Sequence, residues 1–240
     1  MKNKDCLPAW SAFFFLMTWV LAFFSWMGSI YATDEVQSLL SAEGIRWMLG
    51  RVVENYVRTP ALGVALILSM GLGIGVRAGL YDTLKLIFRK ERALSRKERR
   101  AFILATVSLG VYSLLVVGAL LLPWNFLLGV TGSLFRSPFS AGLVYIFSVG
   151  LGLSGMIYGY AIDAFRRSGD VFEGMSLLIR RCASYFVLLF WTVQFFSALT
   201  YTRLDVWVGF SENVVSVLFG ICCYIPLFLQ LKKNIYNNKV

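Results

Sequence analysis

The sequence has no histidine and few charged residues. Of its 240 residues none is His, and only 15% are Asp, Glu, Lys or Arg, whereas a soluble domain carries about 25% charged residues. The lack of His excludes histidine metal sites, Ser-His-Asp triads and His general bases. The four cysteines form no C-x-x-C pair. We interpret them as small apolar side chains in membrane helices rather than as disulfides or metal ligands. We therefore predict no enzyme, no metal and no cofactor.

Apolar residues fill the chain instead. They make up 58% of it, aromatic residues make up 16%, and the mean hydropathy is +0.70. A membrane helix needs about 20 mostly apolar residues. The stretches that meet this requirement are 9–32, 61–80, 101–122, 139–165, 182–201 and 204–231. The sequence thus predicts an all-α polytopic membrane helix bundle of about six transmembrane helices, with residues 1–240 as a single integral membrane domain.

Two segments outside these spans have patterns of their own. Over 38–57 apolar residues recur at helical spacing, which predicts an amphipathic interfacial helix or, equally, an ordinary packed extramembrane helix. Residues 85–100, KLIFRKERALSRKERR, form a basic cytoplasmic loop that favours contact with anionic lipid. Nucleic acid is not expected as a partner, because no domain or aromatic platform accompanies these cations. Within the loop, Ser95 and Glu98 form a capping box at which the next helix should begin.

The distribution of Lys and Arg predicts the orientation in the membrane. With the N-terminus in the cytoplasm, 17 of the 23 Lys and Arg residues fall in cytoplasmic segments and five in outer ones, while Arg77 lies near the inner end of its span. Positively charged residues prefer cytoplasmic loops. Because six spans return the chain to its starting side, both termini are predicted to be cytoplasmic.

Three glycines in the second span share one helix face. Gly71, Gly75 and Gly79 are spaced four residues apart. Membrane helices associate through close packing, which small residues allow, so this face is expected to be a helix-packing surface. Nucleotide binding is the weaker interpretation, because the spacing is not G-x-G-x-x-G and no strand precedes it.

Ionisable and polar residues near the spans are candidates for pairs or pathways, since a charge in hydrocarbon is costly. Asp163 is expected to pair with Arg166 or Arg167 at the inner end of its span. Gln194 lies near the middle of the fifth span, and Glu212 is expected about two turns into the sixth. These two favour a polar pathway, although an interhelical hydrogen bond explains Gln194 equally well.

Several segments, in the same order, resemble the p-aminobenzoyl-glutamate transporter (AbgT) family. Residues 39–79, LLSAEGIRWMLGRVVENYVRTPALGVALILSMGLGIGVRAG, are similar to its first periplasmic helix and second span. SRKERRA at 95–101 resembles the segment before the fifth span, and LLLPWNFLLGVTGSLFRSPFSAG at 120–142 resembles the loop between the fifth and sixth spans. IYGY at 157–160, GMS at 174–176 and VQF at 193–195 are similar to parts of the sixth and seventh spans.

The chain also departs from the family pattern. Family members are roughly twice as long, with nine spans and two re-entrant hairpins that build the substrate site. Here the second span is followed almost directly by SRKERRA, so the third span, first hairpin and fourth span are expected to be missing. Residues 200–205, TYTRLD, stand where the family reads asparagine-tryptophan-serine-asparagine-leucine-glycine, and one apolar span and a basic tail follow instead of the second hairpin.

The resemblance leaves two functions open. A transporter of p-aminobenzoyl-glutamate or related aromatic carboxylates would use a solute path of Gln194, Thr200, Thr202, Asp205 and Glu212. A transport-incompetent scaffold would retain only the outer layer of the fold and associate as a homodimer or with a partner membrane protein. Either function implies a location in the bacterial inner membrane.

Overall fold

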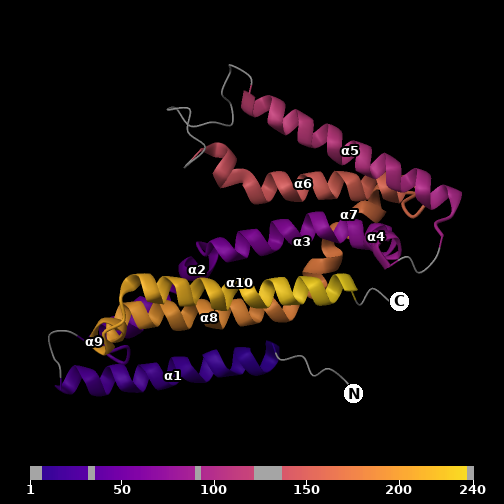
Figure 1. Cartoon of the computed structure of the whole chain (residues 1–240). Coiled ribbons are helices and arrows are strands. Elements are labelled where there is room, and N and C mark those ends of the chain that lie inside the picture. The colour runs from indigo at the N-terminus through magenta and orange to yellow at the C-terminus, as the bar shows by residue number, and fades with distance from the viewer. Residues whose placement is uncertain (1–6, 32–35, 90–92, 122–136, 237–240) are drawn as a thin grey trace. The chain divides into compact units, whose positions relative to one another are not determined.

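The computed structural model describes residues 7–31, 36–89, 93–121 and 137–236, and within these ranges it contains helices and no strand (Figure 1). Six segments are long and apolar enough to span a membrane, which confirms the predicted all-α polytopic class. The helices are α1 Leu7–Tyr31, α2 Ala42–Val57, α3 Pro60–Ala78, α4 Leu80–Arg89, α5 Arg96–Leu121, α6 Pro138–Ala161, α7 Ser168–Arg181, α8 Ala183–Thr202, α9 Leu204–Val208 and α10 Glu212–Tyr236.

The chain divides into two compact units. Unit 1 consists of Met1–Gly63 with Cys182–Gln230, and unit 2 of Val64–Arg181 with Leu231–Val240. Unit 1 therefore contains α1, α2, α8, α9 and most of α10, whereas unit 2 contains most of α3 and all of α4 to α7.

Aromatic and aliphatic side chains of α1, α8 and α10 form a core of unit 1. Phe14 of α1, Phe196 of α8 and Val215 of α10 are buried in one cluster. The Phe196 ring meets Phe219 of α10 at a centroid distance of 5.4 Å. Such edge-on ring contacts add to the burial of apolar surface. In Figure 1, α1 and α10 accordingly run beside α8.

A hydroxyl group of α8 binds a backbone carbonyl of α10 close to a proline inside that helix. Pro226 cannot donate a backbone hydrogen bond, and its ring disturbs the carbonyls of the preceding turn. The fully buried Tyr185 hydroxyl donates to the Cys223 carbonyl in that turn at 3.1 Å. The side chain from α8 thus satisfies a carbonyl in the part of α10 that the proline weakens.

The connection from α1 to α2 is tied to both α1 and α8. Leu39 donates its backbone N–H to the buried Ser25 hydroxyl of α1 at 3.0 Å, and Gln37 donates to the Thr202 carbonyl of α8 at 3.1 Å. Trp47 of α2 stacks on Tyr201 of α8, with ring centroids 4.3 Å apart. The predicted helix over 38–57 is present as α2, which packs on α8 through one face.

The structure corrects the start of the sixth predicted span. Instead of one helix from 204, a five-residue helix, α9, ends at Gly209, and α10 begins at Glu212. Gly209 has φ +89°, donates to the Val206 carbonyl, and is followed by Phe210, which donates to the Asp205 carbonyl. This is a Schellman arrangement, which ends a helix and needs the left-handed conformation that glycine adopts readily. Hydropathy averaged over the span does not locate this end, because the apolar residues of α9 and α10 flank only a short polar stretch at 211–213.

Glycines bring α3 against α6 in unit 2. A Cβ added to Gly71 would lie 2.2 Å from the Ser148 carbonyl oxygen, and one added to Gly155 would lie 2.8 Å from the Gly75 Cα. The Ser148 hydroxyl donates to the Ile67 carbonyl at 2.5 Å across the same contact. Small residues therefore allow the two backbones to touch, as expected for packing in lipid.

Gly79 lies differently from Gly71 and Gly75. An added Cβ would have no neighbour within 4 Å, but the residue has φ +82° and separates α3 from α4. Gly73 packs instead, because its Cβ would lie 2.4 Å from the Gly174 carbonyl oxygen of α7. The structure thus assigns Gly79 to a turn and adds Gly73 to the packed glycines.

The basic segment 85–100 is not a single loop. α4 continues to Arg89, and α5 begins at Arg96, so much of the segment is helical. At the start of α5 the Ser95 hydroxyl accepts from Glu98 N–H at 3.1 Å, and Glu98 accepts from Ser95 N–H at 2.8 Å. This reciprocal pair confirms the predicted capping box.

We predict that Gly71→Ala lowers the free energy of unfolding in detergent by about 1–3 kcal/mol, because the added methyl group overpacks the contact with Ser148. Gly110→Ala is the matched control in α5, where an added Cβ has no neighbour within 4 Å. The control should be neutral or stabilising by up to about 1 kcal/mol, since Ala favours helix over Gly. Melting curves that coincide for the two variants would contradict the packing assignment.

Candidate functional site

The three predicted path residues on α8 use their polar atoms within unit 1. Gln194 donates its side-chain N–H to the Val52 carbonyl of α2 at 2.9 Å. Thr200 and Thr202 donate their hydroxyls to carbonyls one turn earlier in α8, at 3.1 and 3.0 Å. Gln194 therefore forms an interhelical hydrogen bond, which was the alternative to a place in a polar pathway. The two threonine hydroxyls bind carbonyls of their own helix.

Asp205 differs from these neighbours. Its side chain is only 4% exposed, yet the Oδ1 atom has no hydrogen-bond partner among the described residues. The residue lies in α9, between two left-handed positions, Arg203 with φ +56° and Gly209 with φ +89°. A non-glycine residue in this conformation is uncommon and strained. A buried carboxylate oxygen without a hydrogen-bond partner, beside such a position, is a candidate to bind a cation or a polar group of a solute.

The structure also corrects the depth of Glu212. This residue is the first of α10 and its side chain is exposed, rather than two turns inside a span. Acidic residues in the first turn of a helix interact favourably with its dipole. Glu212 lies at a helix end because α9 is a separate helix. In the described part of the chain it forms no hydrogen bond with the other four predicted path residues.

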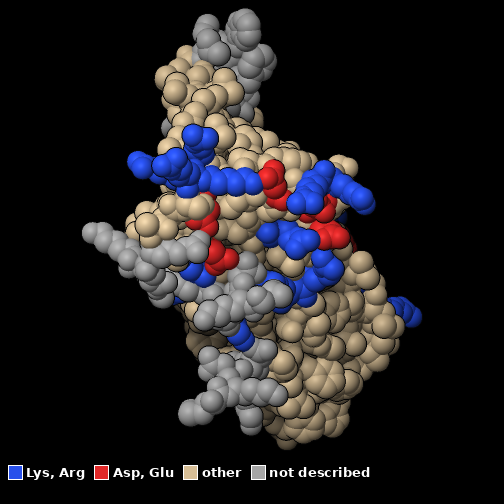
Figure 2. All heavy atoms as spheres, turned by 90° about the vertical axis from the view of Figure 1, so that its right-hand side faces the viewer, with Lys and Arg blue, Asp and Glu red and all other residues tan. Residues whose placement is uncertain are grey.

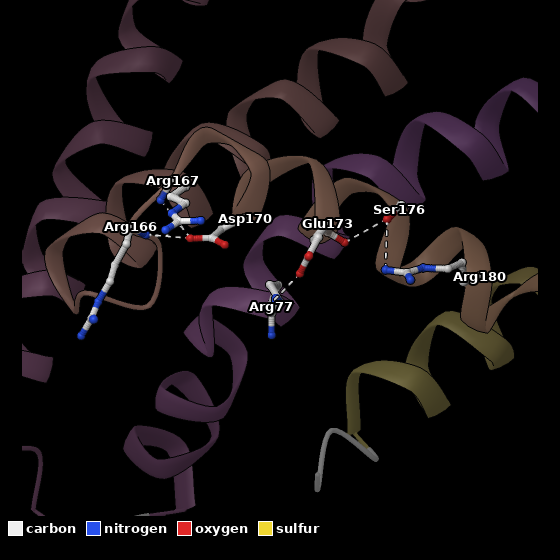
Figure 3. A network of polar contacts seen from close by, with 7 residues as sticks. All are labelled: Arg77, Arg166, Arg167, Asp170, Glu173, Ser176 and Arg180. Carbon is white, nitrogen blue, oxygen red and sulfur yellow. Dashed lines mark hydrogen bonds and ion pairs between the residues drawn. The ribbon is translucent and has the colours of Figure 1, made fainter.

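Charged residues of unit 2 form a second polar region. Figure 2 shows Lys and Arg side chains gathered on one face with Asp and Glu side chains among them. Arg77 at the end of α3 pairs with Glu173 of α7 at 3.0 Å (Figure 3). Arg180 donates to the Ser176 hydroxyl at 3.2 Å, one turn away in α7. Most of these groups thus stabilise the ends of α3 and α7.

Residues of the turn between α6 and α7 form further polar contacts of unit 2. Asp170 accepts from the backbone N–H groups of Arg166 and Arg167 at 2.8 and 3.0 Å, while the Arg166 side chain points away from it (Figure 3). Asp163 has φ +62° and forms an ion pair with Lys97 of α5. The expected pair of Asp163 with Arg166 or Arg167 is therefore wrong, because the turn carries Asp163 toward α5 instead.

These contacts lower the pKa values of two carboxyl groups, those of Asp163 and Asp170. The hydrogen bond and the charge of Lys97 hold the pKa of the Asp163 carboxyl below its ordinary value. The backbone N–H groups of Arg166 and Arg167 lower the pKa of Asp170 in the same way. Each carboxylate is therefore stabilised in its charged form by groups that the fold positions.

A groove lies between α5 and α6 of unit 2. It has a volume of about 340 Å³, and its lining is almost wholly apolar, with Leu109, Val116, Phe139, Leu143 and Phe147 among its residues. Tyr112 borders it but uses its hydroxyl to donate to the Ile146 carbonyl at 2.9 Å. Among the described residues that line the groove there is no cationic side chain to bind a carboxylate, and Ser113 donates its hydroxyl to the Leu109 carbonyl. Within the described ranges no three Cys, Asp or Glu residues gather to hold a metal ion.

Comparison with known proteins identifies the family. A family model described as "AbgT putative transporter family" matches residues 6–91 and 87–218, which together exceed half of the chain. The chain belongs to the AbgT family. This AbgT protein is a multi-pass membrane protein of a transporter family, and the family consists of transporters, not enzymes. The two matches meet inside the basic segment, where the missing spans were expected.

Solved structures agree on the fold. The AbgT protein resembles the Alcanivorax borkumensis YdaH transporter with a TM-score of 0.71 and 18% identity, over 83% of this chain and 72% of that chain. It resembles Neisseria gonorrhoeae MtrF with a TM-score of 0.74 and 13% identity, over 94% of this chain and 81% of that chain. No curated protein matches the sequence. At these identities the likeness establishes the fold.

Sequence reasoning missed some of the polar contacts that the fold creates. The Lys97–Asp163 pair joins residues far apart in the chain, and no local pattern signals it. The amphipathic helix α7 was detectable, because Val171, Gly174 and Leu178 are buried at helical spacing.

We predict that acid weakens the fold through the α6–α7 turn. A carboxyl whose pKa is lowered in the folded state adds stability above its ordinary pKa and loses it as pH falls through the lowered value. The melting temperature of the wild type should therefore fall as the pH is lowered from about 5 to below about 3, and Asp170→Asn should reduce that fall. Glu212→Gln, which removes an exposed carboxyl, is the control and should keep the wild-type profile. Parallel profiles for Asp170→Asn and wild type would refute the prediction.

Proposed function

We propose that this AbgT protein transports p-aminobenzoyl-glutamate or a related aromatic carboxylate across the membrane. The family match supports transport as the general activity. The likeness to MtrF, whose structure is titled as illuminating a class of antimetabolite efflux pumps, supports a small organic solute. The substrate class itself comes from the sequence resemblance.

The observation that carries the proposal is the buried residue Asp205, whose Oδ1 atom has no hydrogen-bond partner among the described residues. A buried carboxylate oxygen without a partner is costly, so it is a candidate to contact a solute or a cation. Asp205 lies next to the end of α8, the helix that holds Gln194, Thr200 and Thr202. On this proposal Asp205 binds the cation that moves with the solute, and the α8–α9 junction is the polar element of the path.

A second candidate function is a scaffold that does not transport. It is favoured by the hydrogen bonds that Gln194, Thr200 and Thr202 make to backbone carbonyls, each of which commits a side-chain donor to the protein rather than to a solute. It is favoured further by where the left-handed residues and helix breaks of the described chain lie. Gly79 and residues 203–211 stand at the ends of spanning helices and not in the middle of one. Transporters of comparable folds bind solutes where helices break near the bilayer midplane. Such a scaffold would act as a homodimer or with a partner membrane protein.

Flux through liposomes distinguishes the two functions. We predict that purified wild-type protein moves labelled p-aminobenzoyl-glutamate faster than empty vesicles, and that Asp205→Asn lowers the rate at least about tenfold, as loss of a group used in the transport step would. Glu212→Gln removes an exposed carboxyl on α10 and should leave the flux unchanged. Absence of flux in the wild type, together with a stable dimer in detergent, would favour the scaffold.

We also propose that the protein lies in the bacterial inner membrane with both termini in the cytoplasm. The excess of Lys and Arg in segments of one side supports this orientation. Within unit 2 it is supported by contacts of the end of α10, whose carbonyls at Asn234 and Ile235 accept from Arg181 and Lys85. The last residues of α10 thus adjoin segments assigned to the cytoplasm.

A fluorescent protein that matures only in the cytoplasm tests the orientation. We predict that its fusion to the C-terminus fluoresces in intact cells, because the basic segments should be retained inside. A fusion within the segment that precedes α2, at residue 38, should remain dark. The reverse pattern would place the termini outside.

A further inference from the structure

The first turn of α5 is the most cationic turn of the described chain. We call Arg96, Lys97, Arg99 and Arg100 the α5 basic turn; all four side chains are exposed. The apolar part of α5 begins at Ala101 and is long enough to cross a membrane. A cation directly before a spanning helix lies at the depth of the lipid head groups. This placement is independent of how the two units are arranged.

An ion pair connects the α5 basic turn with the α6–α7 turn. Lys97 binds Asp163, and the charge of Arg166 also acts on that carboxylate. Lys97 is thus committed to a contact that holds the start of α5 against the α6–α7 turn within unit 2. The turn is held by a protein contact and does not depend on lipid for its position.

The nearby carboxylates already have partners. Glu98 accepts from Ser95 N–H, and Asp170 accepts from two backbone N–H groups. Arg96, Arg99 and Arg100 take part in no ion pair with any described residue. Their positions, three and four residues apart, place them on one face of the helix. Three adjacent guanidinium groups therefore remain available to an external anion.

Other cations of unit 2 are used differently. Arg77 pairs with Glu173, and Arg180 donates to Ser176. Lys85 and Arg181 donate to carbonyls of α10. The α5 basic turn thus differs from these cations because three of its guanidinium groups, within one turn of a helix, form no ion pair with a described residue.

We propose that the α5 basic turn binds the phosphate head groups of anionic phospholipids through Arg96, Arg99 and Arg100. A guanidinium group presents two parallel donors that match two phosphate oxygens, which a lysine ammonium cannot do. The adjacent spanning helix favours a membrane over a soluble anion, because the lipid phosphates lie at the depth of these side chains. This surface is separate from the α8–α9 junction and does not depend on the proposed transport.

Native mass spectrometry of the full-length protein tests the proposal. The protein is titrated in detergent with phosphatidylglycerol and, separately, with phosphatidylcholine. We expect the wild type to bind phosphatidylglycerol preferentially. The triple variant Arg96→Gln/Arg99→Gln/Arg100→Gln should lose affinity for it at least about tenfold, since each cation near a membrane surface contributes about fivefold.

A matched control removes the same charge from unit 1. Arg46→Gln/Arg51→Gln/Arg58→Gln changes three exposed arginines of α2 and its C-cap and should retain the preference for phosphatidylglycerol. Arg96→Lys/Arg99→Lys/Arg100→Lys keeps the charge and should bind with intermediate affinity, because the paired donors are lost. Melting temperatures without lipid should match the wild type and show that the variants are folded.

Three results would overturn the proposal. Equal losses in the α5 and α2 variants would mean a general effect of net charge. Full displacement by inorganic phosphate at equal concentration would indicate a site for free phosphate. Binding of an acidic protein or an RNA that depends on the three arginines, without any preference for phosphatidylglycerol, would replace the lipid with that partner.

Discussion

Direct contact between the backbones of α3 and α6 is the constraint on which unit 2 depends. Gly71 and Gly155 leave no space for a Cβ at this contact, where Gly155 lies against the Gly75 backbone, and Ser148 bridges it by donating to the Ile67 carbonyl. In lipid the hydrophobic effect does not press helices together, so close packing and hydrogen bonds must do so. The packing of Gly73 against Gly174 extends the same principle to α7. The charged ends of these helices are thereby brought close enough to pair.

Unit 1 satisfies its polar groups largely by hydrogen bonds from side chains to backbone carbonyls. Gln194 and Tyr56 link α2 with α8 in this manner, and Tyr185 links α8 with α10. A carbonyl within a membrane has no water to bind, so each such bond removes a penalty as well as adding a contact. Asp205 lies outside this pattern, because its buried Oδ1 atom has no partner among the described residues, and Ser38 Oγ and Asn55 Nδ2 of unit 1 are likewise without one.

The sequence predicted what depends on local pattern. The spanning helices follow from runs of apolar residues, and the capping box of α5 follows from two residues three positions apart. Contacts between distant segments could not be predicted, as Asp163 illustrates: its nearest cations in the chain are Arg166 and Arg167, but the fold pairs it with Lys97. The end of α9 at Gly209 was not predicted, because hydropathy does not report the left-handed conformation of a glycine. The burial of Asp205 likewise required the folded chain.

The two family matches overlap at residues 87–91, which begin in the last turn of α4. The sequence resemblance places the loss of two spans and one re-entrant hairpin at this point. Two crossings cancel, and a re-entrant hairpin returns to the side from which it entered. Such a loss leaves every later helix facing the same side of the bilayer as in the longer relatives. Parity therefore allows a large internal deletion here without reversing the rest of the protein, whereas the loss of a single span would invert α5 and everything after it.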